Sequence, residues 1–390
     1  MRVYFTILLM ILTVAAMPSH ATWYQGQASK VIGKRDFEEV RTETIKQAIA
    51  NAALQGQSFI QAEDIVLDGL LQSSKTVLRS KGQIRRVEVI DEFVDQDVIS
   101  VIVRADIEPL LACEKDIYAK SLLNTQFTIL NPIQASVGAL FDIGTQTTKR
   151  FEQQLNAQPN VQVNSTINQA VFTQKSAGLM NEAELDTLGN HLALQHGSQF
   201  ILFGFIRDIS LFEQVKDEVL YNDIQLRRNF TIQVFLYDAI RNSMIMQKSY
   251  HGEGNWNYPT NHLVDTNNSE FWRNDFGRAV LHTVNSAVTD INDVLACQQS
   301  YAHIVDNYDG KLVINIGQRQ GVKIGDEFDL VKLLRLQGAD GKTRILLTPE
   351  ESSILSVVQV NKNSSVLSSE LQNFEPDSNI LNFVSPKTLF

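Results

Sequence analysis

Hydrophobic and polar residues follow three different patterns along this chain, and each pattern predicts a separate unit. In the first unit, alternation over 23–31 predicts a strand, and apolar residues at helical spacing over 35–56 predict a helix. A long hairpin is expected over 82–109, turning near 95–97. The apolar residues expected to face one another across this hairpin are Ile84, Val87, Val89, Ile90, Val98, Val101, Val103 and Ile107. The first unit is therefore predicted to be an α+β domain.

The second unit alternates strands with helices, which is typical of α/β domains. One apolar run in it is continuous, and this predicts a strand that is covered on both faces. The last expected helix has a buried stripe along its whole length. The expected elements are strands at 124–130 and 198–209, helices from Val137 to Leu155, at 181–197 and from about 268 to 297, and a hairpin over 223–254.

The third unit has short apolar runs bounded by Gly, Asp, Asn and Pro, and no convincing helix. Five or more short strands in about 90 residues predict a small barrel or sandwich. The expected strands lie at 311–317, 326–334, 343–349, 352–361 and 364–369. The three patterns predict an N-terminal α+β domain at 22–110, a middle α/β domain at 111–299 and a C-terminal β domain at 300–390.

The N-terminus has the pattern of a signal peptide. Arg2 precedes an apolar run, and small residues follow as far as Ala21. The run has about 15 residues, whereas a membrane span needs roughly 20. We therefore expect cleavage after Ala21 and an exported, soluble chain that begins at Thr22, with an uncleaved membrane anchor as the alternative. No cysteine stands at position 22, which argues against a lipoprotein.

The charge and the cysteines narrow the class of protein. The formal net charge of −10 argues against a nucleic-acid partner and against binding to anionic membranes.

The two cysteines, Cys113 and Cys297, stand at the two ends of the middle domain. In an oxidising compartment such a pair is a disulfide candidate, and closing so long a loop contributes roughly 5 kcal/mol in the chain-entropy account. Two separate buried thiols are the alternative.

A glycine-rich stretch in the third unit, INIGQRQGVKIGDEFDLV, invites a comparison with phosphate-binding loops. Its glycines are spaced by fours, at Gly317, Gly321 and Gly325. A Walker A loop needs Gly-Lys-[Ser/Thr] ahead of a helix, but here Lys323 follows a valine and a strand comes next. The spacing of a dinucleotide fingerprint is missing too. We expect turns in which glycines supply positive φ, and no cofactor site.

Other candidates for chemistry are weak. His251, Glu253 and His262 lie close in sequence, although their Gly, Asn and Pro neighbours are more typical of a surface loop. Asp95 and Asp97 could attract a hard cation, yet a hairpin tip with two carboxylates is usually a solvated turn. Neither Gly-x-Ser-x-Gly nor His-Glu-x-x-His occurs. We therefore predict no catalytic, cofactor or metal residues and no enzyme.

Several segments, in this order, resemble the flagellar assembly protein T family. They are TWYQGQA at the mature start, GQIRRVEVIDE and VISVIVRADIEP in the hairpin, CEKDIYAKSLLNTQFTILNPIQASVGALFDIG, GSQFILFGFIRDIS, YHGEGNW and INIGQRQGVKIGDEFDLV. The resemblance covers essentially all of 22–390. It implies three domains, of which the middle one looks like the amino-terminal domain of the translocation protein TolB and the last like a small β-barrel.

The resemblance also implies a function. Members of this family are periplasmic structural proteins of the basal body of polar, sodium-driven flagella, where they form the outer H ring and support T-ring and stator assembly. The implied partners are T-ring proteins, L-ring and P-ring components and other copies of the chain. It supplies no catalytic residues. A periplasmic ligand-binding protein, for cell-wall fragments or similar molecules, is the alternative.

Three aromatic residues are candidates for ring contacts. Trp23, Tyr24 and Trp256 lie in segments with the composition of turns, and aromatic side chains often anchor interfaces. We expect the amino-terminal unit and the loops of the middle unit to make these contacts. The alternative is that the three rings complete local cores.

The disulfide gives the first testable prediction. If Cys113 and Cys297 are bonded, the intact mass of the mature chain rises by two hydrogens on reduction, because each sulfur takes up one electron from the reductant and one proton. Mass spectrometry with and without reductant measures this change. A chain that already has the two-thiol mass before reduction contradicts the prediction.

Overall fold

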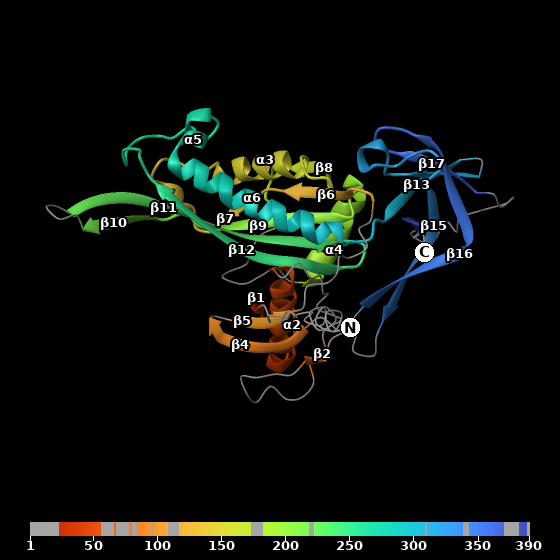
Figure 1. Cartoon of the computed structure of the whole chain (residues 1–390), viewed down its shortest axis with the longest axis horizontal. Coiled ribbons are helices and arrows are strands. Elements are labelled where there is room, and N and C mark those ends of the chain that lie inside the picture. Colours follow the sequence, from red (N-terminus) through yellow and green to blue (C-terminus); the bar gives the residue numbers. More distant parts are fainter. Residues whose placement is uncertain are drawn as a thin grey trace, which may run out of the picture.

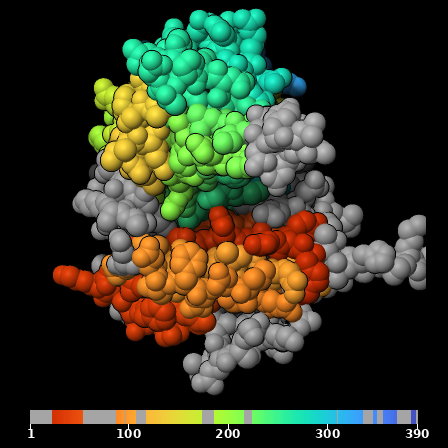
Figure 2. Space-filling view, turned by 90° about the vertical axis from the view of Figure 1, so that its left-hand side faces the viewer, coloured from red at the N-terminus to blue at the C-terminus, as the bar shows by residue number. Residues whose placement is uncertain are grey.

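The computed structural model describes three folded parts joined by short connections (Figure 1). Figure 2 shows the N-terminal part, red to orange, directly below the middle part. The expected signal peptide and Cys113 lie outside the described residues. The described residues are 23–55, 66–67, 78–79, 84–95, 97–107, 117–172, 182–217, 222–308, 310–337, 343–369 and 382–387.

The N-terminal part is a three-stranded antiparallel sheet with one helix on it. The strand order is β1-β5-β4, and Val31 pairs with Val98 in the register of β1 and β5. Asp36 accepts a hydrogen bond from the N–H of Glu39 at 3.1 Å and so caps the helix. The elements are β1 (Trp23–Val31), α2 (Phe37–Gln55), β4 (Ile84–Asp95) and β5 (Val98–Ile107), with a short pair of β2 (Val66–Leu67) and β3 (Leu78–Arg79).

The predicted hairpin of this part is confirmed, but one of its side chains points elsewhere. Val87, Val101 and Val103 are buried against α2, as expected. Ile90 was expected to face the core and is instead 52 % exposed. The register of β4 shifts between Val89 and Asp91, and such a bulge turns the side chain at the extra residue away from its expected face.

The middle part is a seven-stranded mixed sheet. Its main strand order is β10-β11-β9-β6-β8; β12 pairs with β11, and β7 pairs with β9. β6 runs parallel to β8 and β9, while the other long pairs are antiparallel. The strands are β6 (Lys120–Thr125), β7 (Thr128–Ile129), β8 (Val161–Ile167), β9 (Phe200–Asp208), β10 (Leu211–Asp217), β11 (Asn222–Asp238) and β12 (Ser243–Asn255).

Helices cover both faces of this sheet, as the continuous apolar run of β9 predicts. Phe200 and Leu202 belong to the core under α3 and α6, whereas Ile201 and Phe203 belong to the core under α4. Successive residues of one strand thus fill two different cores. The helical elements are η2 (Pro132–Ala135), α3 (Ile143–Leu155), α4 (Glu182–His196), α5 (Ser269–Arg273) and α6 (Asp275–Ala296).

Two expected helices differ from the structure. The helix expected from Val137 begins only at Ile143, because Gly138 and Ala139 have φ of 82° and 54° and cannot continue a right-handed helix. The last helix is divided at Asn274, whose ψ of 161° is extended. The short helix α5 therefore turns away from α6.

The C-terminal part is a closed barrel of six strands in the order β13-β14-β17-β16-β15-β18. The segments expected as two strands at 343–349 and 352–361 form one continuous strand. The strands at both closing positions, β13 and β18, were not among the expected elements. The elements are β13 (Ala302–Tyr308), β14 (Lys311–Ile314), η3 (Gln318–Gln320), β15 (Glu327–Gln337), β16 (Thr343–Val360), β17 (Ser365–Ser369) and β18 (Asn382–Pro386).

The barrel is joined closely to the middle part. The N–H of Ala119 donates to the carbonyl of Gln320 at 3.0 Å, and the amide of Asn315 donates to the carbonyl of Gly197 at 3.0 Å. A small apolar cluster also spans the joint, with Ile240 from the β11–β12 turn packed among barrel residues. Neutral hydrogen bonds and apolar packing together hold the two parts in one orientation.

A buried histidine in the barrel predicts how stability depends on pH. His303 packs on the ring of Phe383, with 4.5 Å between ring centroids, and burial lowers its pKa to about 4. The unfolded chain, with an ordinary histidine pKa of about 6.5, therefore binds the proton first as the pH falls. The free energy of unfolding should fall between pH 6.5 and 4, by up to about 3 kcal/mol from this group.

In His303→Phe this part of the pH dependence should disappear, because the new side chain binds no proton. Urea unfolding followed at several values between pH 4 and 7 measures the effect. His191→Gln is the matched control, since His191 is exposed on α4 and should leave the profile unchanged. An unaltered profile in His303→Phe would contradict the prediction.

Candidate interaction surfaces

Trp23 and Tyr24 begin the edge strand β1 and are half-buried. The guanidinium of Arg104 lies over the Trp23 ring, 4.7 Å from its centroid. Tyr24 packs against the core between the sheet and α2. Both rings thus support the local fold while part of each remains accessible, and their role as interface anchors stays a prediction.

Trp256 lies in the core of the middle part. It is 4 % exposed and packs on Phe276, with 5.7 Å between ring centroids. The guanidinium of Arg228 also lies over the Trp256 ring, 4.1 Å from the ring centroid. The structure favours the local-core interpretation for this residue, because an interface role would require this core to open.

Arg228 is a buried residue of the middle part that holds two segments of the chain together. Its side chain is 0 % exposed, and burial lowers its pKa to about 10. Nη2 donates to the carbonyls of Gln134 and Val137 at 3.1 and 2.9 Å. Arg228 therefore fastens the chain around η2 to the core that holds Trp256. Its position within an alternating β11 gives no sequence signal that would separate it from a surface arginine.

The candidate ligands of the middle part are engaged separately. Nδ1 of His251 lies 2.8 Å from Oγ1 of Thr231, Glu253 pairs with Arg227 at 3.0 Å, and the ring of His262 stacks on Tyr258. No group of three His, Cys, Asp or Glu side chains is placed to hold a metal ion within the described part of the chain.

The acidic tip of the N-terminal hairpin has a structural task. The carboxylate of Asp97 accepts hydrogen bonds from the N–H of Gly33 at 3.1 and 3.2 Å. The N–H of Ile32 donates to the carbonyl of Asp97 at 2.8 Å. These bonds tie the end of β1 to the β4–β5 turn.

The glycines of the barrel form turns, as expected at two positions of three. Gly321 and Gly325 have φ of 97° and 91°, a region that favours glycine. The expectation of positive φ is wrong for Gly317, whose φ is −151°. Glycine is needed there for close approach, because a Cβ would collide with the carbonyl of Asn361 and the backbone of Ser364.

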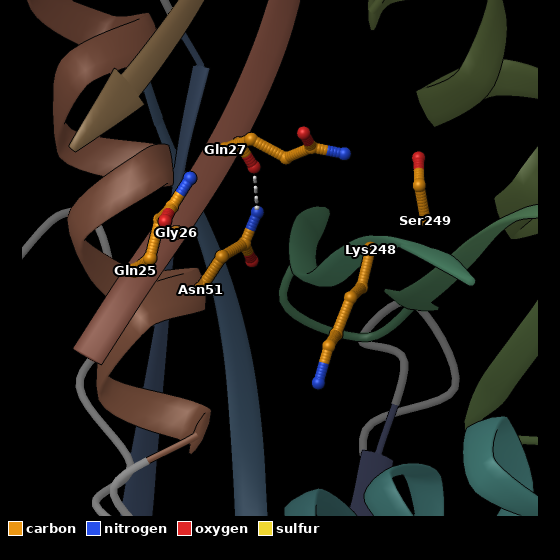
Figure 3. A pocket seen from close by; sticks show the side chains of 6 residues that line it. All are labelled: Gln25, Gly26, Gln27, Asn51, Lys248 and Ser249. Atoms are coloured by element: carbon orange, nitrogen blue, oxygen red, sulfur yellow. Dashed lines mark hydrogen bonds between the residues drawn. The ribbon is translucent and has the colours of Figure 1, made fainter. Parts of the chain in front are cut away.

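A polar pocket of about 310 Å³ lies between the N-terminal part and the edge strand β12 (Figure 3). Nδ2 of Asn51 donates to the carbonyl of Gln27 at 2.8 Å on one wall. The ammonium group of Lys248 points away from Gln27 and Ser249 and pairs with Asp290 at 2.6 Å. The pocket thus presents mainly amide and hydroxyl groups. Its lining residues are Gln25, Gly26, Gln27, Asn51, Lys248 and Ser249.

Three exposed apolar side chains lie on β4, and only one of them, Ile90, was expected to face the core. Ile90, Phe93 and Val94 are 50 to 52 % exposed. Ile90 lies at the bulge in β4, and Phe93 and Val94 follow it toward the turn; neither alternation nor spacing marks a bulge in advance. Such side chains on an edge strand are suited to contact another protein.

Cys297 caps the C-terminal end of α6 and is disulfide-bonded. Its expected partner, Cys113, lies outside the described residues, so their pairing stays a prediction. No helix in the described ranges is long and apolar enough to cross a membrane.

Three domain models of one family match the chain in order. The N-terminal domain of flagellar assembly protein T matches residues 22–109, the middle domain matches 111–266 and the C-terminal domain matches 309–380. The chain belongs to the flagellar assembly protein T family. The resemblance stated from sequence segments is thereby confirmed, as is the fold class of an α+β multidomain protein with a closed C-terminal barrel.

Comparisons outside the flagellar assembly protein T family give little. No curated protein matches the chain. Among solved structures, a hypothetical protein from Chlamydia trachomatis is 14 % identical, with a TM-score of 0.32, and the match covers 46 % of this chain and 100 % of that one. A PelC dodecamer from Paraburkholderia phytofirmans is 9 % identical, with a TM-score of 0.25 and coverage of 46 % and 93 %. We draw no functional conclusion from these likenesses.

The burial of Trp256 predicts the outcome of its removal. Trp256→Ala should lower the free energy of unfolding by about 3–5 kcal/mol, because it leaves a cavity beside Phe276 and uncovers Arg228. Trp23→Ala should cost much less, since Trp23 is half-buried at an edge. Urea unfolding of both variants measures the difference. Equal stabilities would contradict the core position of Trp256.

Proposed function

We propose that this member of the flagellar assembly protein T family is a periplasmic structural protein that forms the outer H ring of the basal body. In that position it supports assembly of the T ring and the stator for motility. The observation that carries the proposal is the ordered match of three domains of one flagellar assembly family over residues 22–380. The signal-peptide pattern at 1–21 supports export to the periplasm.

The proposed partners are T-ring proteins, L-ring and P-ring components and other copies of the chain. A scaffold acts through surfaces, and exposed apolar side chains are present on all three parts of the molecule. Ile90, Phe93 and Val94 lie on the N-terminal sheet, while Phe141 and Leu263 lie on loops of the middle part. These exposed side chains support the expectation that the N-terminal part and the loops of the middle part make ring contacts.

The family is one of flagellar assembly and not a known enzyme family. We therefore propose that the chain has no catalytic activity and works by binding alone. The histidines and carboxylates that the sequence brought together are engaged in separate structural contacts, which supports this view.

Electron microscopy of basal bodies tests the proposed function. Basal bodies purified from cells without the gene should lack or thin the outer ring, because the chain is the material of that ring. Restoring the gene should restore the ring. Basal bodies of unchanged appearance, together with normal swimming, would overturn the proposal.

A ligand-binding role remains the second candidate, and the pocket beside β12 favours it. Amide and hydroxyl groups around about 310 Å³ suit a neutral polar molecule such as a glycan fragment. Thermal stabilisation of the purified chain by cell-wall glycan fragments would support this role by mass action. Asn51→Ala should then abolish the stabilisation.

A further inference from the structure

Two segments of the middle part expose apolar side chains side by side. The N–H of Val264 donates to the carbonyl of Gly138 at 2.9 Å, which holds segment 256–270 against segment 131–142. Figure 2 shows the yellow and blue-green parts of the chain adjoining on one face. Three apolar side chains on these segments, Ile133, Phe141 and Leu263, are 81, 58 and 76 % exposed. We name them, with their acidic neighbours, the acidic patch.

The charge of this patch has one sign. The two segments contain Asp142, Asp265 and Glu270 but no lysine or arginine. Asp265 and Glu270 are exposed, and Asp142 is half-buried and accepts a hydrogen bond from Thr266. The nearest cation along the chain is Arg273, at the end of α5; Arg228, which bonds to segment 131–142, is fully buried.

A second exposed apolar pair lies at the joint between the middle part and the barrel. Ile117 and Ile324 are 80 and 73 % exposed. The bond between Ala119 and Gln320 holds the chain at 117 against the turn that carries Ile324. This turn is the glycine-rich stretch of the sequence, whose Gly321 and Gly325 allow it to project. We name the pair, with its basic neighbours, the basic patch.

The charge of the second patch is opposite. Segments 317–325 and 361–364 contain Arg319, Lys323 and Lys362 but no acid, and all three are exposed. The N–H of Arg319 donates to the carbonyl of Lys362 at 3.2 Å, so the two segments touch. Two acids adjoin the patch along the chain: Asp116, which precedes Ile117 and lies outside the described residues, and Asp326, which is half-buried and accepts hydrogen bonds from the hydroxyl of Tyr118 and the N–H of Lys323.

We propose that the acidic patch of one copy of this chain binds the basic patch of the next copy. Each patch has exposed apolar side chains, and the exposed charges of segments 131–142 and 256–270 are acidic whereas those of segments 317–325 and 361–364 are basic. Such pairing steers the two surfaces together and disfavours contact between like patches. The inference rests on the proposed ring function and names the surfaces that build the ring.

The positions of the patches suit a chain of copies. Figure 1 places α5 at one end of the seven-stranded sheet and the barrel at the other. One copy cannot join its own two patches across the sheet. A contact between two different surfaces is heterologous and generates a ring or an open helix, whereas a contact of one patch with itself would stop at a dimer.

Photo-cross-linking in basal bodies tests the contact directly. A photoreactive amino acid at position 263 should cross-link to another copy at 317–325 or at Ile117, and one at position 324 should reach 131–142 or 256–270. Position 305 is the control, because Val305 is 59 % exposed on β13 outside both patches. Mass spectrometry of the linked peptides identifies the contact.

Single variants supply a second measurement. Leu263→Lys and Ile324→Glu each place at the centre of one patch a charge that the partner patch repels, and each should reduce the amount of chain in purified basal bodies at least about tenfold. Val305→Glu should not. Far-UV circular dichroism and urea unfolding establish that all three variants fold, as their exposed positions lead us to expect.

Co-expression of the two patch variants separates this contact from other causes of failure. Leu263→Lys retains its basic patch and Ile324→Glu retains its acidic patch, so the two should form cross-linked pairs but no ring.

Cross-links from 263 to 263, cross-links only to a different protein, or no cross-links at either position would overturn the inference. If any of these occurs while deletion of the gene still removes the outer ring, the proposed function stands and only the surfaces are wrong. Normal basal bodies after deletion would overturn the proposed function itself.

Discussion

Burial of β9 on both faces is the constraint on which the middle part depends. Seven consecutive residues from Phe200 to Ile206 are buried, and alternate side chains enter the cores under α3–α6 and under α4. Gly204, within this run, has no room for a side chain. A Cβ at this position would collide with the ring of Phe127 and would lie only 2.7 Å from the carbonyl oxygen of Gln233. Phe127 in turn stacks on Phe151 of α3 at 4.6 Å. The helices, and the loops that they carry, therefore take their positions from this strand.

Much of this architecture could be predicted because it depends on the spacing of apolar residues that are close together in the sequence. The apolar run of β9, the hairpins and the helix before Gly197 were recognised from spacing that does not depend on distant residues. What failed was non-local. β18 pairs with β13 and β15, far apart in sequence, and only barrel closure gives it partners. Ile90 is exposed because β4 has a bulge. Trp256 is buried because Arg228, from β11, packs on its ring. Neither feature produces a recognisable pattern in the sequence.

Arg228 links the buried core to the surface proposed for assembly. Its guanidinium lies on Trp256, which begins one segment of the acidic patch, and it donates to the carbonyls of Gln134 and Val137 in the other. A charged side chain is costly to bury unless its hydrogen bonds are satisfied. Arg228 is buried where segments 131–142 and 256–270 meet, and its contacts reach both of them. We therefore interpret it as the group that fixes the position of one segment relative to the other.

The joints between the parts differ in strength, and this difference bears on how a ring could form. The barrel is held to the middle part by hydrogen bonds near 3.0 Å and by a shared apolar cluster. At the N-terminal part, Gln247 bonds Asn51 and Ser29 only at 3.5 Å, beside a polar pocket. The acidic and basic patches both lie on the closely joined pair, so their separation and angle are fixed within one copy. A ring built through them would take its curvature from that fixed angle, and the N-terminal part, with its exposed β4, would be free to adjust to other proteins.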